Sequence, residues 1–202
     1  ITPAEIPAYE IPPKEGPRIL VAVKHVGELG DGFTISEDGL SIAAEHFEFS
    51  LNEWDDAALE QALLLSEKIG SSEVVAVTIG PEEAEETLRK VLAKGAHRAV
   101  RVWDDSLAAA DPVTIARALA GVAKREEADL VLTGVQSSDL AQGATGSATA
   151  RILGLPHAAV VLEAEWDGGA TLTATREIEG GMRQRFQLPA PALLTIQTGG
   201  HT

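Results

Sequence analysis

From Ile19 onward, short apolar runs rich in β-branched residues alternate with longer segments in which apolar residues recur at helical spacing. Apolar runs of this length are typical of strands buried on both faces, and they occupy residues 19–23, 74–79, 99–103 and 129–134. The other segments predict helices at residues 55–69, 81–95, 112–126 and 143–154. Strand–helix alternation implies a parallel sheet with right-handed crossovers. We therefore predict a three-layer, Rossmann-like α/β fold, with helices on both faces of a mostly parallel sheet.

The C-terminal part differs, because predicted strands follow one another there without helices between them. These strands occupy residues 158–165, 170–178, 182–188 and 192–197. The turns Asp167-Gly168-Gly169 and Glu179-Gly180-Gly181 have the composition of tight hairpin connections. The pattern therefore predicts an antiparallel C-terminal extension of the sheet.

The first 17 residues hold half of the ten prolines of the chain, namely Pro3, Pro7, Pro12, Pro13 and Pro17. Proline fixes φ and biases the preceding residue toward extended backbone, so a packed helix is not expected here. We predict a proline-rich arm or linker over residues 1–17, followed by a single α/β domain over residues 18–202.

Composition and charge exclude several classes of function. The formal net charge of −15 leaves no basic footprint for nucleic acid. The absence of cysteine excludes disulfides, thiolate nucleophiles and Cys-ligated metals. No apolar run approaches the ~20 residues that span a bilayer, so we expect a soluble, cytoplasmic protein without membrane insertion. The five histidines lack metal-ligand spacing, and no Gly-x-Ser-x-Gly elbow occurs.

The segment from Gly134 to Gly146 is the richest candidate for a binding loop. It runs from a predicted buried strand into a predicted helix and consists largely of small residues. Such a loop offers unhindered backbone N–H groups, hydroxyls and a helix N-terminus, which together stabilise a phosphate. Glycine and serine are also ordinary loop formers, so both interpretations stay open. A Walker loop and a Gly-x-Gly-x-x-Gly turn are both absent.

Trp54 is the other notable residue, because it directly precedes a predicted helix in a chain with only 4% aromatic residues. An aromatic ring at that position could pack on a planar cofactor or on a partner protein. It could equally serve as a hydrophobic anchor.

Four stretches, taken in order, resemble the beta subunit of electron transfer flavoproteins, particularly the type paired with bacterial trimethylamine dehydrogenase. They are Ile19-Leu-Val-Ala-Val-Lys24, Ser50-Leu-Asn-Glu-Trp-Asp-Asp56, residues 88–105 and Gly134-Val-Gln-Ser-Ser-Asp139. Downstream, Arg176-Glu-Ile-Glu-Gly-Gly181, Pro191 and Leu194-Thr-Ile-Gln197 look like the C-terminal signature of that family. The resemblance covers about residues 18–197.

This resemblance implies a function. The beta subunit of the family is one part of an alpha/beta heterodimer and binds AMP, whereas the redox-active FAD is held mainly by the alpha subunit. The chain would thus be an electron carrier that receives electrons from a dehydrogenase and catalyses no bond-making step of its own. In the family a dehydrogenase-docking loop and a C-terminal arm follow the last strand, whereas the sequence given ends Thr198-Gly-Gly-His-Thr202.

The resemblance also assigns a cofactor site, position by position. The residues carried over are Ala22, Asn52, Glu53, Trp54, Asp55, Ile79, Gly134, Val135, Gln136, Ser137, Ser138, Asp139, Leu140, Ala141, Gln142, Gly143, Ala144 and Thr145. Many relatives have polar residues at 140, 141 and 143, so backbone donors are expected to carry more of the binding there. Trp54 falls at the aromatic position that approaches the flavin from the beta side.

Two other hypotheses about the function of the chain stay open at this point. Universal stress proteins share the broad architecture, and Gly146-Ser147 is similar to the end of their phosphate motif, although the motif needs glycine where Ser137 stands. Such a protein would be a stand-alone ATP-binding regulator. Electron-bifurcating members of the flavoprotein family instead hold a second FAD in the AMP region. The stretches 52–55 and 136–139 favour AMP.

Overall fold

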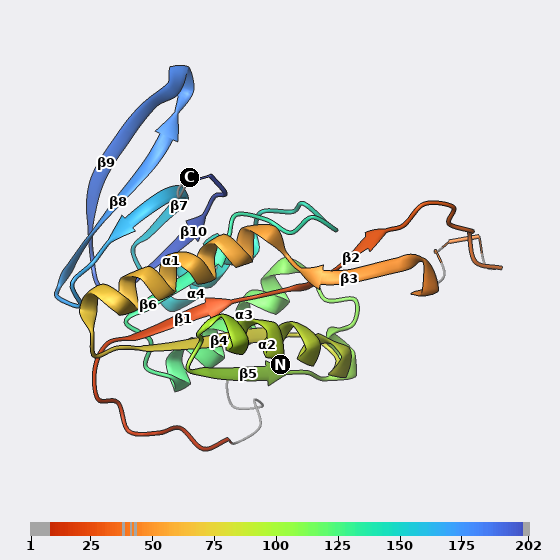
Figure 1. The fold of residues 1–202 in the computed structure, drawn as a ribbon, viewed down its shortest axis with the longest axis horizontal. Helices are drawn as coiled ribbons and strands as arrows, with labels where there is room; N and C mark the ends of the chain where they lie inside the picture. The colour runs from red at the N-terminus through yellow and green to blue at the C-terminus, as the bar shows by residue number, and fades with distance from the viewer. Residues whose placement is uncertain (1–8, 38, 41, 43, 200–202) are drawn as a thin grey trace.

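The computed structural model describes residues 9–37, 39–40, 42 and 44–199. Its main feature is an eight-stranded sheet in the order β5-β4-β1-β6-β10-β7-β8-β9 (Figure 1). The strands are β1 (Arg18–Ala22), β4 (Glu73–Ile79), β5 (Arg98–Val102), β6 (Leu130–Gly134), β7 (His157–Glu165), β8 (Thr171–Ile178), β9 (Met182–Pro189) and β10 (Ala192–Ile196). All pairings from β5 across to β7 are parallel, and β7, β8 and β9 pair antiparallel. The predicted mostly parallel sheet with an antiparallel extension is confirmed.

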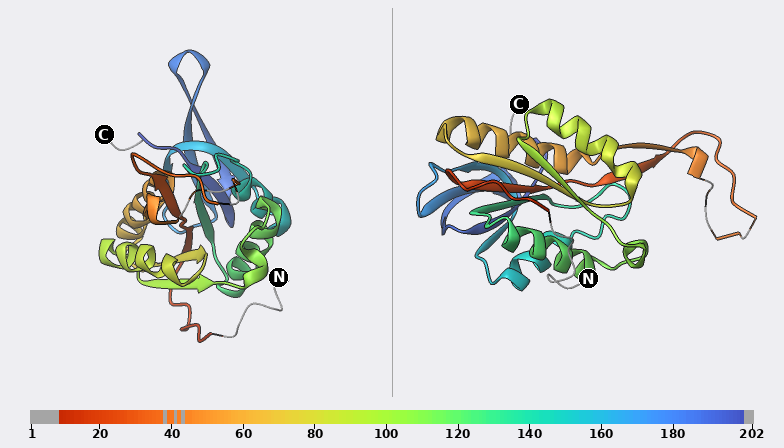
Figure 2. Two further views of the ribbon diagram at one scale, coloured as in Figure 1. Left: turned by 90° about the vertical axis from the view of Figure 1, so that its right-hand side faces the viewer. Right: turned by 90° about the horizontal axis from the view of Figure 1, so that it is seen from below.

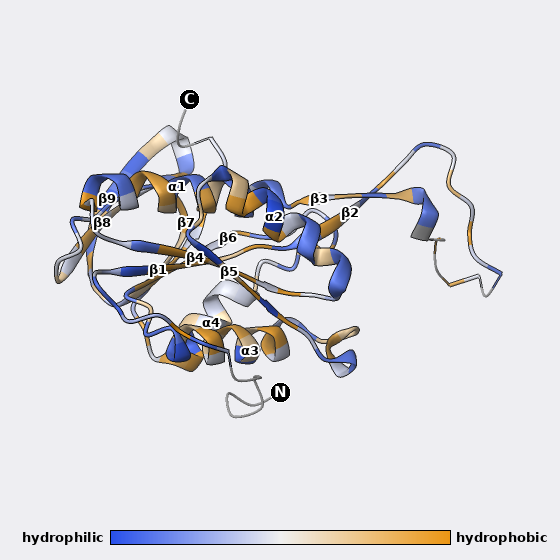
Figure 3. Cartoon of the chain, turned by 60° about the horizontal axis from the view of Figure 1, so that its bottom comes forward, coloured by the Kyte–Doolittle hydropathy of each residue, from blue (hydrophilic) through white to orange (hydrophobic). Residues whose placement is uncertain are grey.

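Helices cover both faces of the sheet, as Figure 2 shows. They are α1 (Glu53–Ile69), α2 (Glu85–Lys94), α3 (Pro112–Arg125) and α4 (Thr145–Leu153), with short 3₁₀ turns at Ala44–His46, Glu82–Ala84, Asp105–Leu107 and Glu179–Gly181. Polar and apolar residues alternate around the helices (Figure 3). The apolar sides of α1 and α2 pack in one core cluster, and the apolar side of α3 and part of α4 pack in a second. None of the described helices is long and apolar enough to cross a bilayer.

Strand β10 differs from the expectation that the C-terminal strands run antiparallel. It lies between β6 and β7 and pairs parallel with both. All five of its residues are buried. This pattern is typical of a central parallel strand, whereas a hairpin strand usually has one solvent-exposed face. Its run Ala-Leu-Leu-Thr-Ile is apolar apart from Thr195 and resembles the runs that predicted the parallel strands.

A two-stranded ribbon was not predicted. Strand β2 (His25–Leu29) pairs antiparallel with β3 (Phe47–Leu51), and the ribbon projects beyond the main sheet (Figure 1). Residues 47–51 alternate between apolar and polar side chains, but residues 25–29 do not, so the sequence shows no hairpin pattern that joins the two strands.

A network of buried charges lies at the amino ends of β1, β4 and β5. Arg18 is only 2% exposed and contacts carboxylates of Glu73 (2.6 Å) and Glu126 (3.4 Å). Arg98 pairs with both of the same glutamates. The arm segment 9–17 runs over this network, and the Tyr9 hydroxyl donates to Glu126 at 2.7 Å. Burial and the neighbouring Glu126 raise the pKa of Tyr9 above its ordinary value.

Candidate functional site

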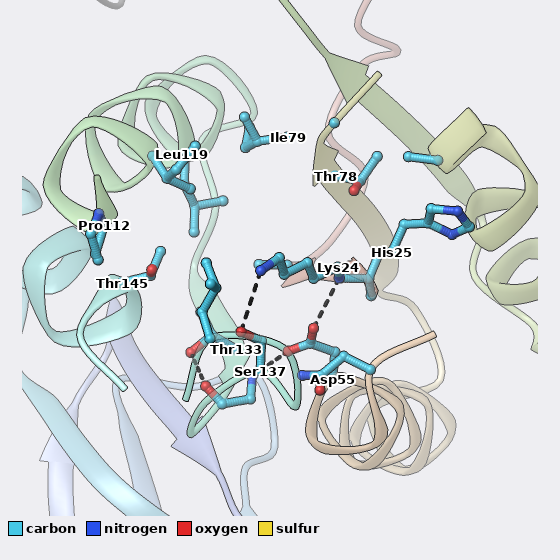
Figure 4. Close-up of a pocket in the computed structure, with 18 of the residues that line it drawn as sticks. Lys24, His25, Asp55, Thr78, Ile79, Pro112, Leu119, Thr133, Ser137 and Thr145 are labelled. Carbon is cyan, nitrogen blue, oxygen red and sulfur yellow. Dashed lines mark hydrogen bonds between the residues drawn. The ribbon is translucent and has the colours of Figure 1, made fainter. Parts of the chain in front are cut away.

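A cavity of about 380 Å³ opens at the carboxyl ends of β1, β4 and β6 (Figure 4). Ligands of open α/β sheets bind at this edge, where the strand order reverses on either side of the first strand. The cavity also falls in the ~300–1,000 Å³ range of small-molecule sites. Most of the residues carried over from the resemblance line it, namely Ala22, Asn52, Asp55, Ile79, Gly134, Val135, Gln136, Ser137, Leu140, Gln142, Gly143, Ala144 and Thr145.

The polar side of the cavity is the loop between β6 and α4. Helix α4 begins at Thr145 with no side-chain cap at Ala144 and no acidic residue in its first turn. The backbone N–H groups at this end therefore lack a carboxylate or hydroxyl cap, and the helix dipole favours an anion beside them. Helix α1, by contrast, begins with three acidic residues. The geometry thus favours an anion at α4 and disfavours one at α1.

The apolar side of the cavity was missed by sequence reasoning. Trp103, which directly follows β5, lines it together with Leu107, Pro112, Ile115 and Leu119 from the next 3₁₀ turn and α3. In Figure 4, Ile79 and Leu119 lie on one side of the cavity and Lys24 lies on the other. The position of Trp103 at the end of the predicted strand 99–103 was the one signal that could have identified this wall. A planar, largely apolar group fits between these side chains.

Asn52 and Asp55 line the cavity, but their polar atoms hold the protein backbone. The two carboxylate oxygens of Asp55 accept from the backbone N–H groups of Gly134 and Lys24, both at 2.9 Å. The Asn52 amide donates to the Gln136 carbonyl at 2.8 Å and accepts from the Ser138 N–H at 3.2 Å. These two side chains therefore fix the loop after β6 to the end of β1.

An ion pair closes part of the cavity rim. The Lys24 ammonium lies 2.6 Å and 2.7 Å from the two oxygens of Asp139 and 3.4 Å from the Ser137 hydroxyl. Burial opposes ionisation of Asp139, but Lys24 and Ser137 outweigh it, so the pKa of Asp139 is lowered. Figure 4 shows the Lys24 side chain reaching into the space between Ser137 and the opposite wall. Its positive charge is paired with Asp139 at the cavity rim.

Several predicted site residues do not line the cavity: Glu53, Trp54, Ser138, Asp139 and Ala141. Glu53 is exposed at the start of α1. The Trp54 indole N–H donates to the Gln197 side chain at 2.8 Å, outside the cavity. Ser138 and Asp139 act through the hydrogen bonds given above. Trp54 therefore lies beside the end of β10 and does not line the cavity. Its role as a flavin contact stays a prediction.

Titration of Asp55 is expected to make stability depend on pH. Burial raises its pKa to about 7, although the two backbone N–H donors act in the opposite direction. Between the ordinary carboxyl pKa and about 7, the folded chain holds a proton that the unfolded chain has released, so stability falls as pH rises through this window. At ~1.4 kcal/mol per pKa unit the loss amounts to a few kcal/mol.

The measurement is urea unfolding at pH 5 and pH 8 for the wild type and Asp55→Asn. The amide does not titrate, so the variant should lack this part of the pH dependence, whatever its own stability. Equal pH dependence in both proteins would show that Asp55 ionises normally.

No group of three or more His, Asp or Glu suited to a metal ion occurs among the residues that the structure describes. The cavity combines the uncapped start of α4 at one end with an apolar wall at the other.

Comparison with known proteins identifies the family of the chain. The electron transfer flavoprotein domain family matches residues 40–200. The electron transfer flavoprotein subunit beta of Methylophilus methylotrophus is 46% identical over 184 residues, covering 90% of this chain and 70% of the relative. The corresponding subunits of Bradyrhizobium diazoefficiens and Homo sapiens are 34% and 35% identical, each covering 88% of this chain and 70% of the relative.

Proposed function

This chain belongs to the electron transfer flavoprotein family as a beta subunit, and on that premise we propose that its cavity binds AMP as a structural ligand. The observation that carries the proposal is the pairing, in one cavity, of an uncapped helix N-terminus with an apolar wall. A phosphate suits the first, and an adenine base suits the second.

The residues at each end fit such a nucleotide. The phosphate would be held by backbone N–H groups of residues 143–145, by the Thr145 hydroxyl and by the Lys24 ammonium. The base would lie against Ile79 and the wall formed by Trp103 and α3. Asn52 and Asp55 would act indirectly, because they keep the loop after β6 in place. Their bonds to the backbone exist before a ligand arrives, so the site is preorganised.

We further propose that the chain pairs with an alpha subunit and carries electrons from a dehydrogenase without a catalytic step of its own. FAD, held mainly by the alpha subunit, would supply the redox chemistry. Trp54 is the proposed contact from this chain, since it lies in the first turn of α1 outside the nucleotide cavity. The nucleotide in the cavity would have no redox role and would stabilise the fold.

The test has two readouts. Denaturing the purified alpha/beta complex should release AMP and FAD in equal amounts, as measured by chromatography of the supernatant. Adding AMP to nucleotide-stripped protein should raise its melting temperature, because a ligand at 100 times its dissociation constant adds about 2.7 kcal/mol to stability.

Related ligands serve as controls. Adenosine should stabilise less than AMP, because it lacks the phosphate for the α4 end. A second equivalent of FAD in place of AMP would identify a bifurcating protein, and a preference for ATP would contradict the proposal. Family membership leaves the interpretation as a universal stress protein without support.

A further inference from the structure

The ribbon of β2 and β3 projects from the carboxyl edge of the main sheet and leaves the body of the domain (Figures 1 and 2). Its register places His25 opposite Leu51, Gly27 opposite Phe49 and Leu29 opposite Phe47. Side chains alternate between the two faces of such a pair, so these six residues share one face. A two-stranded ribbon is marginally stable in water on its own.

The face with Leu29, Phe47 and Phe49 is apolar and exposed. Leu29 is 43% exposed and Phe49 is 46% exposed. A Cβ on Gly27 would come within 3.0 Å of the Phe47 ring and 3.1 Å of the Phe49 ring, so the glycine allows both rings to lie over the strand. The result is an apolar face on which Leu29 and Phe49 stay about half exposed in the part of the chain that the structure describes.

The opposite face carries two acidic residues directly across from each other, Glu28 and Glu48. Like charges at this spacing destabilise a strand pair. Among the described residues neither carboxylate has a cationic partner, and the sequence has six Asp or Glu but no Lys or Arg from residue 25 to residue 51. An arrangement unfavourable in isolation becomes favourable if a cation approaches from another molecule.

We propose that this ribbon is the docking element for the alpha subunit, which would cover Leu29 and Phe49 with an apolar surface and present Lys or Arg to Glu28 and Glu48. The inference rests on the proposed heterodimer and adds the surface that forms it. Charge complementarity selects the partner, since a second copy of this chain would bring its own net charge of −15. A membrane with anionic headgroups is repelled for the same reason.

Two residues of the ribbon also line the proposed nucleotide cavity. The His25 and Phe49 rings are stacked, with centroids 4.9 Å apart and planes 8° apart, and both line the cavity. The His25 ring is further held by a 2.8 Å hydrogen bond to the Thr87 hydroxyl. A partner seated on Phe49 would therefore lie next to the wall of the nucleotide site.

The test measures binding of the full-length chain to the immobilised, FAD-loaded alpha subunit of the same organism. Leu29→Ser should weaken binding about tenfold, which corresponds to ~1.4 kcal/mol. Glu28→Lys combined with Glu48→Lys should weaken binding about 100-fold, because two attractive contacts become repulsive. Both changes are at exposed positions, so the melting temperature should stay close to that of the wild type.

Matched variants separate docking from general effects. Leu92→Ser changes a leucine of similar exposure (41%) on α2. Glu60→Lys combined with Glu67→Lys makes the same change in net charge on the exposed side of α1. Both controls should bind within about twofold of the wild type.

The outcomes differ for the two proposals. If the wild type binds the alpha subunit and the ribbon variants bind equally well, or the controls weaken binding as much, the docking inference is wrong and the heterodimer stands. Failure of the wild type to bind at all would overturn both. Dimers of this chain alone that disappear on Leu29→Ser would show that the ribbon pairs with a second copy and would also overturn the inference.

Discussion

Replacement of Glu126 by alanine is expected to lower the free energy of unfolding by about 3–5 kcal/mol, the usual cost of removing one partner from a buried ion pair. The Glu126 side chain is fully buried and lies 3.4 Å from Arg18 and 2.5 Å from Arg98. Without it, two guanidinium groups share the single carboxylate of Glu73. Arg18, at 2% exposure, has no access to water that could compensate.

Two further variants serve as comparisons for the stability loss of Glu126→Ala. Glu127→Ala removes the neighbouring carboxylate, which is exposed, and should change stability by less than about 0.5 kcal/mol. Tyr9→Phe removes one hydrogen bond to Glu126 and should cost about 1 kcal/mol. Urea unfolding measures all three. If Glu126→Ala is no less stable than Glu127→Ala, the buried network contributes nothing to stability.

The parallel sheet could be predicted because each strand is encoded locally. Runs such as Ile19–Val23 are apolar throughout. A strand with no polar, solvent-exposed face has to lie in the interior of a sheet. The order of the strands in the sheet could not be predicted in the same way. Strand β10 has the same apolar character, yet its place between β6 and β7 depends on packing against residues about 60 and 35 positions away in the sequence, which no local pattern records.

The two halves of the cavity were predictable to different degrees. The loop after β6 has an unusual composition, so it could be identified from the sequence. The wall formed by Ile115 and Leu119 could not, because an apolar residue that faces a cavity looks the same in the sequence as one that faces the core. Asn52 and Asp55 were assigned to the site, but their bonds to loop backbone became visible only in three dimensions.

The ribbon escaped prediction for a physical reason of its own. Strand β3 does alternate between apolar and polar residues, but its partner β2 does not, because Gly27 and Glu28 interrupt it, so no hairpin pattern joins the two strands. The buried charge network was hidden as well. Arg18 and Glu126 lie 108 positions apart, and either residue alone reads as an ordinary surface charge.

Replacement of Gly134 by alanine is expected to be the most damaging single change at the nucleotide site. A Cβ at this position would lie 2.5 Å from Asp55 Oδ1, 2.7 Å from Trp54 Cβ and 2.9 Å from the Trp54 backbone carbon. The two Trp54 atoms are fixed by the backbone at the start of α1 and cannot turn away as a flexible side chain could. Either α1 or the end of β6 must shift, at a cost of about 3 kcal/mol.

That shift would also break the hydrogen bond from the Gly134 N–H to Asp55 and would displace the loop that follows. We therefore expect Gly134→Ala to lose AMP-induced stabilisation as well as intrinsic stability, and the nucleotide titration described above measures both. Gly154→Ala is the matched control. Its φ of 69° costs an alanine about 1 kcal/mol, but nothing lies within 4 Å of the added Cβ. The control should therefore be less stable than the wild type and still respond fully to AMP. A Gly134→Ala protein that responds like the control would mean that close contact between β6 and α1 is not what shapes the site.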